Sequence, residues 1–190
     1  REAELTYFGA LPDAKTSPRA VIDVGGGSTE VISMVNGSPK GKSVDVGSVR
    51  LTEMFVSDHP IAASELAAVR EYAQEAFLRV DLDASAIHDV IAVAGTPTTL
   101  AALDQRIEFQ EEKVNGYTLS LQAIEDWIQK LAKMSVAQRE SLPGMQPKRA
   151  DVIVTGSIIL AEAIRRLKKD SVTVSTRGVR YGVAQAWQTF

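Results

Sequence analysis

The segment from residue 23 to residue 30 combines acidic, glycine and hydroxyl residues, which together suit the binding of a phosphorylated ligand. Consecutive glycines let the backbone approach a ligand without an intervening Cβ, so their N–H groups can point at phosphate oxygens. Hydroxyl groups add hydrogen-bond donors, and carboxylates are the hard oxygen ligands that Mg²⁺ prefers. We interpret the segment as a phosphate-binding turn; the alternative is a glycine-rich turn between two strands that binds nothing. Its residues are Asp23, Val24, Gly25, Gly26, Gly27, Ser28, Thr29 and Glu30.

A second glycine turn follows the apolar strand predicted at residues 90–94. Gly95 and Thr96 precede Pro97, and proline is favoured at the first position of a helix, so we expect Thr96 to be the N-cap. The N-terminus of a helix presents free N–H groups and therefore forms a second candidate anion site, with simple capping as the alternative. Arg180, between two glycines, is either a third phosphate contact or a solvated charge.

The pattern around the first turn predicts a three-stranded meander. An apolar run leads into Asp23, and Asn36 and Gly37 separate two further apolar runs at residues 29–35 and 39–46. Asn-Gly between apolar runs is a strong hairpin signal, so these two runs should pair antiparallel.

The rest of the chain reads mainly as helices that begin at hydroxyl caps. Ser120 is a candidate N-cap, and Ser135 with Gln138 forms a candidate capping box. Residues 150–169 are ambiguous, because residues 152–154 resemble a strand whereas the pattern from residue 158 onwards is helical. The predicted elements are helices at 64–80, after Ser120, after Ser135 and from Gly178 to about residue 188, with a final strand at 171–175.

Composition limits the kinds of function that the chain can have. Its 190 residues suffice for one ordinary domain, and its net charge of -3 argues against a broad surface for nucleic acid. No apolar run approaches the roughly 18 residues of a membrane span. The absence of cysteine excludes disulfides and thiolate metal sites and fits a cytoplasmic protein. Neither a Rossmann fingerprint nor a Walker loop is present, and His59 and His88 have no partner at metal-ligand spacing, so we interpret both as structural.

A series of motifs along the whole chain resembles the exopolyphosphatase and guanosine pentaphosphate phosphohydrolase (Ppx/GppA) family of the actin-like ATPase superfamily. The first of them is highly specific, and the others follow in the family's order. They are Val-Ile-Asp-Val-Gly-Gly-Gly-Ser-Thr-Glu at 21–30, Gly-Ser-Val-Arg-Leu-Thr-Glu at 47–53, Gly-Thr at 95–96, Thr-Leu-Ala-Ala-Leu at 99–103, Asn-Gly-Tyr-Thr-Leu at 115–119, Leu-Pro-Gly at 142–144, Arg-Ala-Asp-Val-Ile at 149–153 and Gly-Val-Arg-Tyr-Gly at 178–182.

The resemblance implies an α/β fold of the actin-like ATPase (ribonuclease H-like) class, with a three-stranded meander and two further strands flanked by helices. It also implies one long helix over residues 150–169. Members of the family have two actin-like domains with the active site between them, and the phosphate loop of their first domain is absent here. By this resemblance residues 1–18 form the crossover segment between the domains, and residues 19–190 form the second domain. The chain begins with Arg1 and not with methionine, which agrees with an N-terminal domain that is missing from this sequence.

The resemblance also assigns roles to individual residues. Glu2-Ala3-Glu4-Leu5 matches the stretch that carries the family's catalytic glutamate, and Gly9 follows at the family's spacing. Glu2 is thus the implied general base for the water that attacks the terminal phosphorus. The implied metal ligands are Asp23 and Glu30 for Mg²⁺; the implied phosphate-binding residues are Gly25, Gly26, Gly27 and Ser28, with Gly95 and Thr96 on the opposite side of the groove.

The leading hypothesis is hydrolysis of the terminal phosphoanhydride of inorganic polyphosphate in the cytoplasm, with this chain supplying half of the site. Hydrolysis of guanosine pentaphosphate (pppGpp) is the alternative with the same chemistry. A nucleotide-binding module of an actin-like ATPase or kinase, or a non-catalytic phosphate sensor, is the alternative of another class. We expect no nucleic-acid or membrane partner, leave a homodimer open, and expect little turnover from this chain alone.

Overall fold

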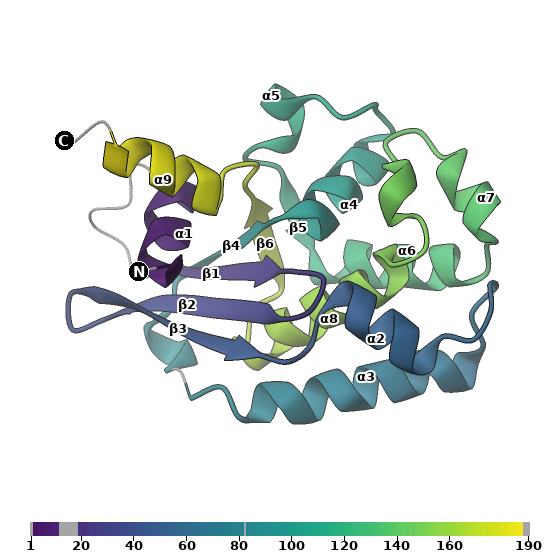
Figure 1. The fold of residues 1–190 in the computed structure, drawn as a ribbon, viewed down its shortest axis with the longest axis horizontal. Coiled ribbons are helices and arrows are strands. Elements are labelled where there is room, and N and C mark those ends of the chain that lie inside the picture. The colour runs from purple at the N-terminus through teal and green to yellow at the C-terminus, as the bar shows by residue number, and fades with distance from the viewer. Residues whose placement is uncertain (1, 12–18, 82, 188–190) are drawn as a thin grey trace.

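A computed structural model of the chain describes residues 2–11, 19–81 and 83–187, with the backbone alone at residue 2 and residues 185–187. These residues form one six-stranded sheet with helices on both faces (Figure 1). The strand order is β3-β2-β1-β4-β6-β5, in which β1, β4 and β6 run parallel and the remaining pairs are antiparallel. The strands are β1 Arg19–Val24, β2 Thr29–Val35, β3 Ser38–Val44, β4 Asp89–Val93, β5 Thr118–Ser120 and β6 Ser171–Val174.

The predicted meander is confirmed, but the sheet has one more strand than predicted. Asn36 and Gly37 adopt positive φ values of 51° and 77°, as a tight hairpin between twisted strands requires. Three strands follow the meander, where two were expected. The additional strand, β5, has only three residues and its last residue, Ser120, is also the N-cap of the next helix, so it is too short to show a strand periodicity.

The hydroxyl caps predicted at Ser120 and Ser135 are confirmed. Ser120 accepts a hydrogen bond from the N–H of Ala123, and Ser135 and Gln138 form the reciprocal capping box. No helix of the described residues is both long and apolar enough to cross a membrane. The helices are α1 Glu2–Ala10, α2 Ser48–Phe55, α3 Ala63–Leu78, α4 Gly95–Gln105, α5 Glu111–Val114, α6 Leu121–Ala132, α7 Val136–Glu140, α8 Ile153–Arg166 and α9 Val179–Trp187, with 3₁₀ turns at Ala84–Ala86 and Pro147–Arg149.

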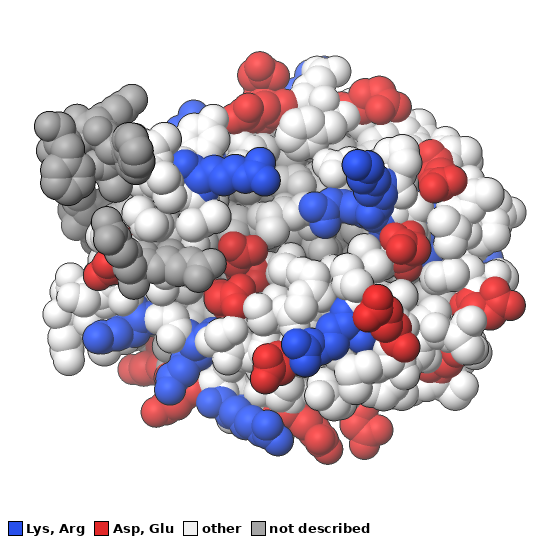
Figure 2. Space-filling model, in the orientation of Figure 1, with Lys and Arg blue, Asp and Glu red and all other residues white. Residues whose placement is uncertain are grey.

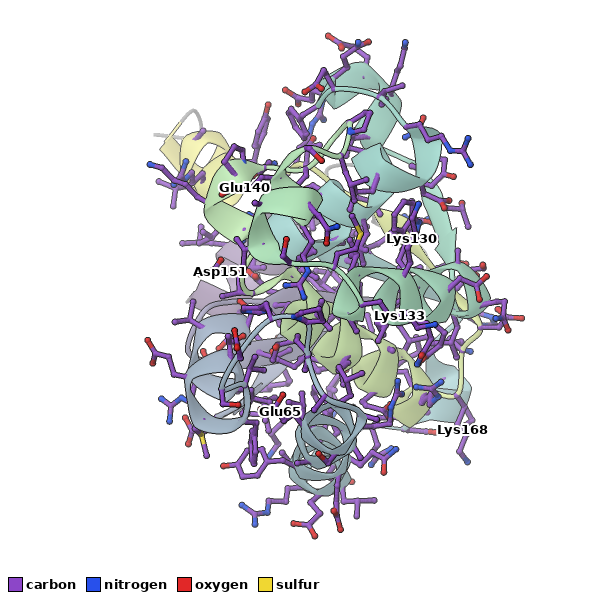
Figure 3. All side chains as sticks on the ribbon, turned by 90° about the vertical axis from the view of Figure 1, so that its right-hand side faces the viewer. Glu65, Lys130, Lys133, Glu140, Asp151 and Lys168 are labelled. Carbon is purple, nitrogen blue, oxygen red and sulfur yellow. The ribbon has the colours of Figure 1, made fainter. Side chains whose placement is uncertain are left out.

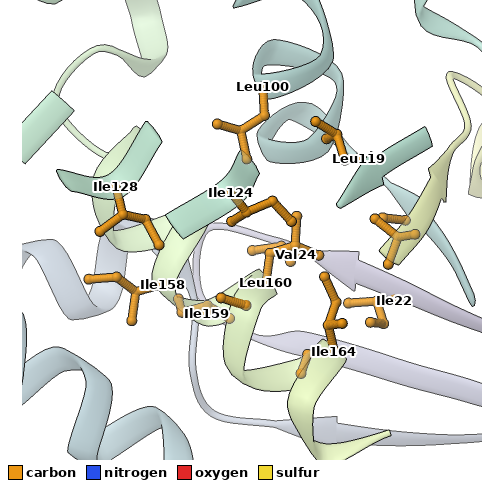
Figure 4. Close-up of a cluster of buried hydrophobic side chains, with 14 of the residues drawn as sticks. Ile22, Val24, Leu100, Leu119, Ile124, Ile128, Ile158, Ile159, Leu160 and Ile164 are labelled. Carbon is orange, nitrogen blue, oxygen red and sulfur yellow. The ribbon is translucent and has the colours of Figure 1, made fainter. Parts of the chain in front are cut away.

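The helix α8 lies at the centre of the main core. The expected helix over residues 150–169 exists, although it is shorter and runs from Ile153 to Arg166. Every residue from Ile153 to Ile164 is buried. The sequence of a helix that is buried on all sides does not alternate between an apolar and a polar face, so it lacks the periodicity that predicts a helix. Figure 4 shows side chains of α8 packed between β1 and the helices α4 and α6, for example Leu160 near Val24.

A smaller core covers the other face of the sheet. Tyr7 and Leu11, in and just after α1, pack against Val21, Ile32 and Val93 on β1, β2 and β4. The helix α9 lies on α1 (Figure 1), and the two backbones are very close, because a Cβ on Gly9 would lie 2.3 Å from the carbonyl oxygen of Gly178. The helix pair therefore covers this face beside the carboxyl ends of β1 and β4.

Candidate functional site

The glycine turn between β1 and β2 is held by the first turn of α2. The N–H of Gly25 donates to the carbonyl of Ser28 over 3.0 Å, while the N–H of Ser48 donates to the carbonyl of Gly25 over 2.9 Å and that of Val49 to the carbonyl of Gly26 over 3.0 Å. The carbonyls of the turn thus face α2. The N–H groups of Gly26, Gly27 and Ser28 have no hydrogen-bond partner in the described part of the chain, and Gly26 and Gly27 are exposed. Three backbone donors are therefore available to an anion, whereas the N–H of Gly25 is used within the turn.

Asp23 and Glu30 are direct neighbours on adjacent strands. They are paired across the antiparallel β1–β2 ladder, so their side chains leave the same face of the sheet. Ser28 and Ser43 both donate their hydroxyls to Oε1 of Glu30, over 2.8 Å and 2.7 Å, which fixes that carboxylate. Figure 2 shows acidic side chains over the ends of β1 and β2 near the middle of this face, with basic side chains over α4 and beside α9 above them.

This acid pair fits a divalent cation. Like charges placed directly opposite each other on a sheet repel, and a bound cation removes that repulsion. Mg²⁺ is usually held by one or two carboxylates together with waters and substrate phosphates, so two carboxylates form a sufficient protein donor set. The described side chains contain no group of three or more acidic or histidine residues that could hold a metal by themselves.

The second glycine turn begins one residue earlier than predicted. Thr96 is not the N-cap of α4: the helix starts at Gly95, and the N-cap is Ala94, with φ 75° and ψ -169°. A residue other than glycine rarely adopts this conformation, and such strain is concentrated at functional sites. The hydroxyl of Thr98 donates to the carbonyl of Ala94 over 3.0 Å, and Thr96 is buried in the first turn. Gly95 and Thr96 thus lie at a helix N-terminus, as expected, although the cap is a different residue.

The guanidinium of Arg149 lies directly on Gly95. A Cβ on Gly95 would lie only 1.7 Å from Cζ of Arg149 and 2.0 Å from its Nη2, so only glycine leaves room for this contact. Nε of Arg149 donates to Oε1 of Gln146 over 3.2 Å. A full positive charge therefore reinforces the N-terminus of α4. Arg149 was not identified from the sequence, since a basic residue in a loop next to Lys148 carries no local signal of its target.

The first turns of three helices meet behind these residues. A Cβ on Gly156, in α8, would lie 2.5 Å from Oγ1 of Thr96 in α4 and 3.3 Å from Cβ of Ser48 in α2. The hydroxyl of Thr52 in α2 donates to Oγ1 of Thr155 in α8 over 2.8 Å, which ties these two helices together. Each helix N-terminus carries about half a positive charge. The chain thus builds a local positive potential from its backbone despite its net charge of -3.

Glu2 begins α1, and its side chain lies outside the described residues. The adjacent Ala3 packs with Ile32, and a Cβ on Gly41 would lie 3.0 Å from Cβ of Ala3. Ile32 is two residues from Glu30 on the same face of β2, so α1 begins on the face of the sheet that carries the acid pair. Arg180 is exposed in the first turn of α9, and its part in phosphate binding stays a prediction.

Comparison with known sequences gives one consistent result. Residues 1–189 match the Ppx/GppA phosphatase family. Exopolyphosphatase 2 of Mycobacterium tuberculosis is 34% identical over 199 residues, which cover 96% of this chain and 60% of that protein. The bifunctional 3-dehydroquinate synthase/phosphatase of Fusobacterium nucleatum is 31% identical over 160 residues, which cover 82% of this chain and 24% of that protein.

Solved structures agree with the sequence comparison. The Ppx/GppA family member of Aquifex aeolicus superimposes with a TM-score of 0.90 at 26% identity, over 99% of this chain and 62% of its own. An exopolyphosphatase from Cytophaga hutchinsonii superimposes with a TM-score of 0.82 at 25% identity, over 99% of this chain and 63% of its own. The expected actin-like α/β fold is thereby confirmed, and the chain spans about 60% of the length of the first of these relatives.

Proposed function

The chain belongs to the Ppx/GppA phosphatase family, and we propose that it supplies one side of an active site that hydrolyses the terminal phosphoanhydride of inorganic polyphosphate. One observation carries the proposal: an anion-binding surface lies at the same end of the sheet as a pair of carboxylates. The surface consists of the free N–H groups of the glycine turn, the N-terminus of α4 and the guanidinium of Arg149. The carboxylates are those of Asp23 and Glu30.

This arrangement meets the known requirements of phosphoryl transfer. The reaction needs charge neutralisation, an aligned water and little covalent assistance from the protein. We assign the N–H groups of Gly26, Gly27 and Ser28 to the oxygens of the terminal phosphate, and Arg149 to the phosphate chain on the side of α4. Asp23 and Glu30 would hold Mg²⁺, which when bound neutralises charge on the phosphate oxygens.

We assign the role of general base to Glu2. Ala3, next to Glu2, packs on the cluster that contains Ile32, two residues from Glu30 on β2, which supports a position of Glu2 near the proposed phosphate site. A carboxylate there can take the proton from the water that attacks the terminal phosphorus. The close packing of α9 on α1 would fix the position of this helix relative to the sheet.

We further propose that a preceding actin-like domain of the same cytoplasmic protein closes the site, with residues 1–18 as the crossover segment and residues 19–190 as the second domain. The support is the length of the relatives, of which the chain spans about 60%, and the apolar side chains of Phe8 and Val183, which α1 and α9 leave exposed. A site with one wall admits water and holds only part of the substrate, so this chain alone should turn over slowly.

The proposal is tested by phosphate release from long-chain polyphosphate and from guanosine pentaphosphate, with Mg²⁺, by the protein encoded by the complete reading frame. We expect phosphate release from polyphosphate. Preferential release from guanosine pentaphosphate would instead identify the nucleotide as the substrate. If neither substrate releases phosphate, calorimetry with ATP and with tripolyphosphate tests whether the chain is a nucleotide-binding module or a non-catalytic phosphate sensor. Affinity for ATP that depends on the adenine would indicate a nucleotide-binding module and would refute the proposed hydrolysis.

A further inference from the structure

Arg139, in the short helix α7, is a charged residue in the interior of the domain. Its side chain is 0% exposed, which is rare for arginine because burial of a charge is costly unless it is well bonded. Nε donates to the carbonyl of Leu131 over 2.8 Å, and Nη1 donates to the carbonyl of Ala150 over 2.9 Å. Burial lowers the pKa of Arg139 to about 10, against an opposing effect of the Asp151 carboxylate. The guanidinium is therefore charged at neutral pH and joins two segments of the chain.

The two carbonyls lie at the C-terminal ends of two different helical segments. Leu131 lies in the last turn of α6, where its carbonyl also accepts from the N–H of Met134 over 3.1 Å, and carbonyls at a helix C-terminus carry partial negative charge. Ala150 is buried and is the C-cap of the 3₁₀ turn Pro147–Arg149, which precedes the start of α8 at Ile153. Figure 3 shows this side of the molecule and labels Glu140 and Asp151, which follow Arg139 and Ala150 in the sequence. A planar guanidinium donates along fixed directions, so it sets the relative position of both carbonyls.

The residue before Ala150 is Arg149, whose guanidinium lies on Gly95 at the N-terminus of α4. Arg149 is the last residue of a three-residue 3₁₀ turn, Pro147–Arg149, and so short a turn has little stability of its own. The carbonyl that Arg139 holds belongs to Ala150, the residue that follows Arg149. The contact with Gly95 and the contact with Arg139 are thus made by two adjacent residues.

We propose that Arg139 is a positioning residue that acts through Arg149: by fixing the Ala150 carbonyl it holds the Arg149 guanidinium over the N-terminus of α4. The inference rests on the proposed function in one respect, namely that Arg149 contacts the phosphate chain of the substrate. Arg139 itself is buried and touches no substrate. It sets the affinity of the site by fixing the position of the half-buried Arg149 guanidinium.

A double-mutant cycle tests the proposal on the complete protein, with calorimetry of tripolyphosphate binding and steady-state hydrolysis as readouts. The variants are Arg139→Lys, which keeps the charge but not the fixed fork of donors, Arg149→Ala, and the two combined. We expect each single variant to weaken binding and raise KM about tenfold or more, as for the loss of a hydrogen bond to a charged group. The combined variant should be no weaker than Arg149→Ala, because residues that act through one contact are not additive.

A matched control separates positioning from a general loss of stability. Arg70 also carries a partly buried charge, which contacts Glu162 in α8 and bonds Glu125 in α6 over 2.8 Å. Glu162 lies in the C-terminal half of α8, away from the end of the helix that follows Arg149. Arg70→Met should lower the melting temperature and leave KM unchanged. Hydrogen exchange at residues 146–152 should accelerate in Arg139→Lys but not in Arg70→Met. Arg139→Met is an additional variant, and the proposal does not depend on its folding.

The outcomes distinguish the two levels of the proposal. Additive losses in the combined variant, or a raised KM in Arg70→Met, would overturn the role of Arg139 while leaving the phosphate site intact. If Arg149→Ala binds tripolyphosphate as the wild type does, the assignment of Arg149 in the proposed function is wrong, and the role of Arg139 falls with it.

Discussion

Substitution of Gly95 by alanine should reduce catalysis while leaving the fold intact. The new Cβ would lie 1.7 Å from Cζ of Arg149 and 2.1 Å from its Nε, so the guanidinium has to leave the N-terminus of α4. The colliding atoms are the end of a flexible side chain, and we expect the guanidinium to swing towards solvent with no movement of the backbone. Alanine is also a better helix residue than glycine by roughly 0.5–1 kcal/mol. The free energy of unfolding should therefore change by no more than about 1 kcal/mol.

The kinetic loss can be estimated from the contact that disappears. A hydrogen bond to a charged group contributes about 1.5–3 kcal/mol, and each 1.4 kcal/mol is about tenfold in rate or affinity. Loss of the bond between Arg149 and the phosphate chain should therefore lower kcat/KM for polyphosphate about 10- to 150-fold. The assay is steady-state phosphate release, with chemical denaturation of the same preparation. An unchanged kcat/KM in Gly95→Ala would refute the assignment of Arg149 to the substrate.

Gly156→Ala is the matched comparison. Its Cβ would lie 2.5 Å from Oγ1 of Thr96, and Thr96 is buried in the first turn of α4 and cannot swing aside. Overpacking of this kind costs about 1–3 kcal/mol, so Gly156→Ala should lose both stability and activity. If the two alanine variants lose stability equally, the collision at Gly95 displaces the backbone, and the reasoning from a flexible Arg149 fails.

Three further predictions address the base and two ionisable groups away from the site. Glu2→Gln should lower kcat about 10²- to 10⁴-fold with little change in KM, and a near-normal rate would place the base elsewhere. Burial acts to raise the pKa of Glu125, but hydrogen bonds, above all that from Arg70, hold this pKa below its ordinary value. The stabilisation by Glu125 should therefore be complete above the ordinary pKa and lost as pH falls through the lowered pKa of the folded state. In denaturation experiments, the stability of Glu125→Gln should depend less on pH in this acid range than that of the wild type. The hydrogen bond to Asp104, aided by burial, raises the pKa of Tyr117 to about 12. Its stabilisation is therefore present below the ordinary tyrosine pKa and lost as pH rises through about 12. Ultraviolet titration should show a late tyrosine that Asp104→Asn shifts to lower pH.

Features that depend on neighbouring residues in the sequence could be predicted. The hairpin at Asn36 and Gly37 and the caps at Ser120 and Ser135 are local, because a residue needs only its own conformation or a backbone group three positions away. The helix α8 could not be read in this way. Its neighbours bury it on all sides, so its start looked like a strand and only the family resemblance indicated one helix.

Features that depend on distant neighbours were missed or misplaced. Arg149 reaches Gly95 across more than fifty positions of sequence, and nothing in its own segment identifies that target. Threonine is a common N-cap residue, but Thr96 packs closely against Gly156 inside the first turn of α4. The N-cap is instead Ala94, which has a strained backbone conformation. The short helix α2, which holds the carbonyls of the glycine turn, was not predicted at all.

The two halves of the site act on the same ligand with opposite sign. In the proposed site the backbone N–H groups and Arg149 would attract a polyphosphate chain, whereas Asp23 and Glu30 would repel it unless a cation lies between them. Metal and polyphosphate should therefore strengthen each other's binding, and by the same factor, since linkage is reciprocal. Ser28 connects the two sites, because its hydroxyl holds Oε1 of Glu30 while its N–H faces the proposed phosphate. A substitution there should weaken the coupling between the two ligands as well as the affinity for each.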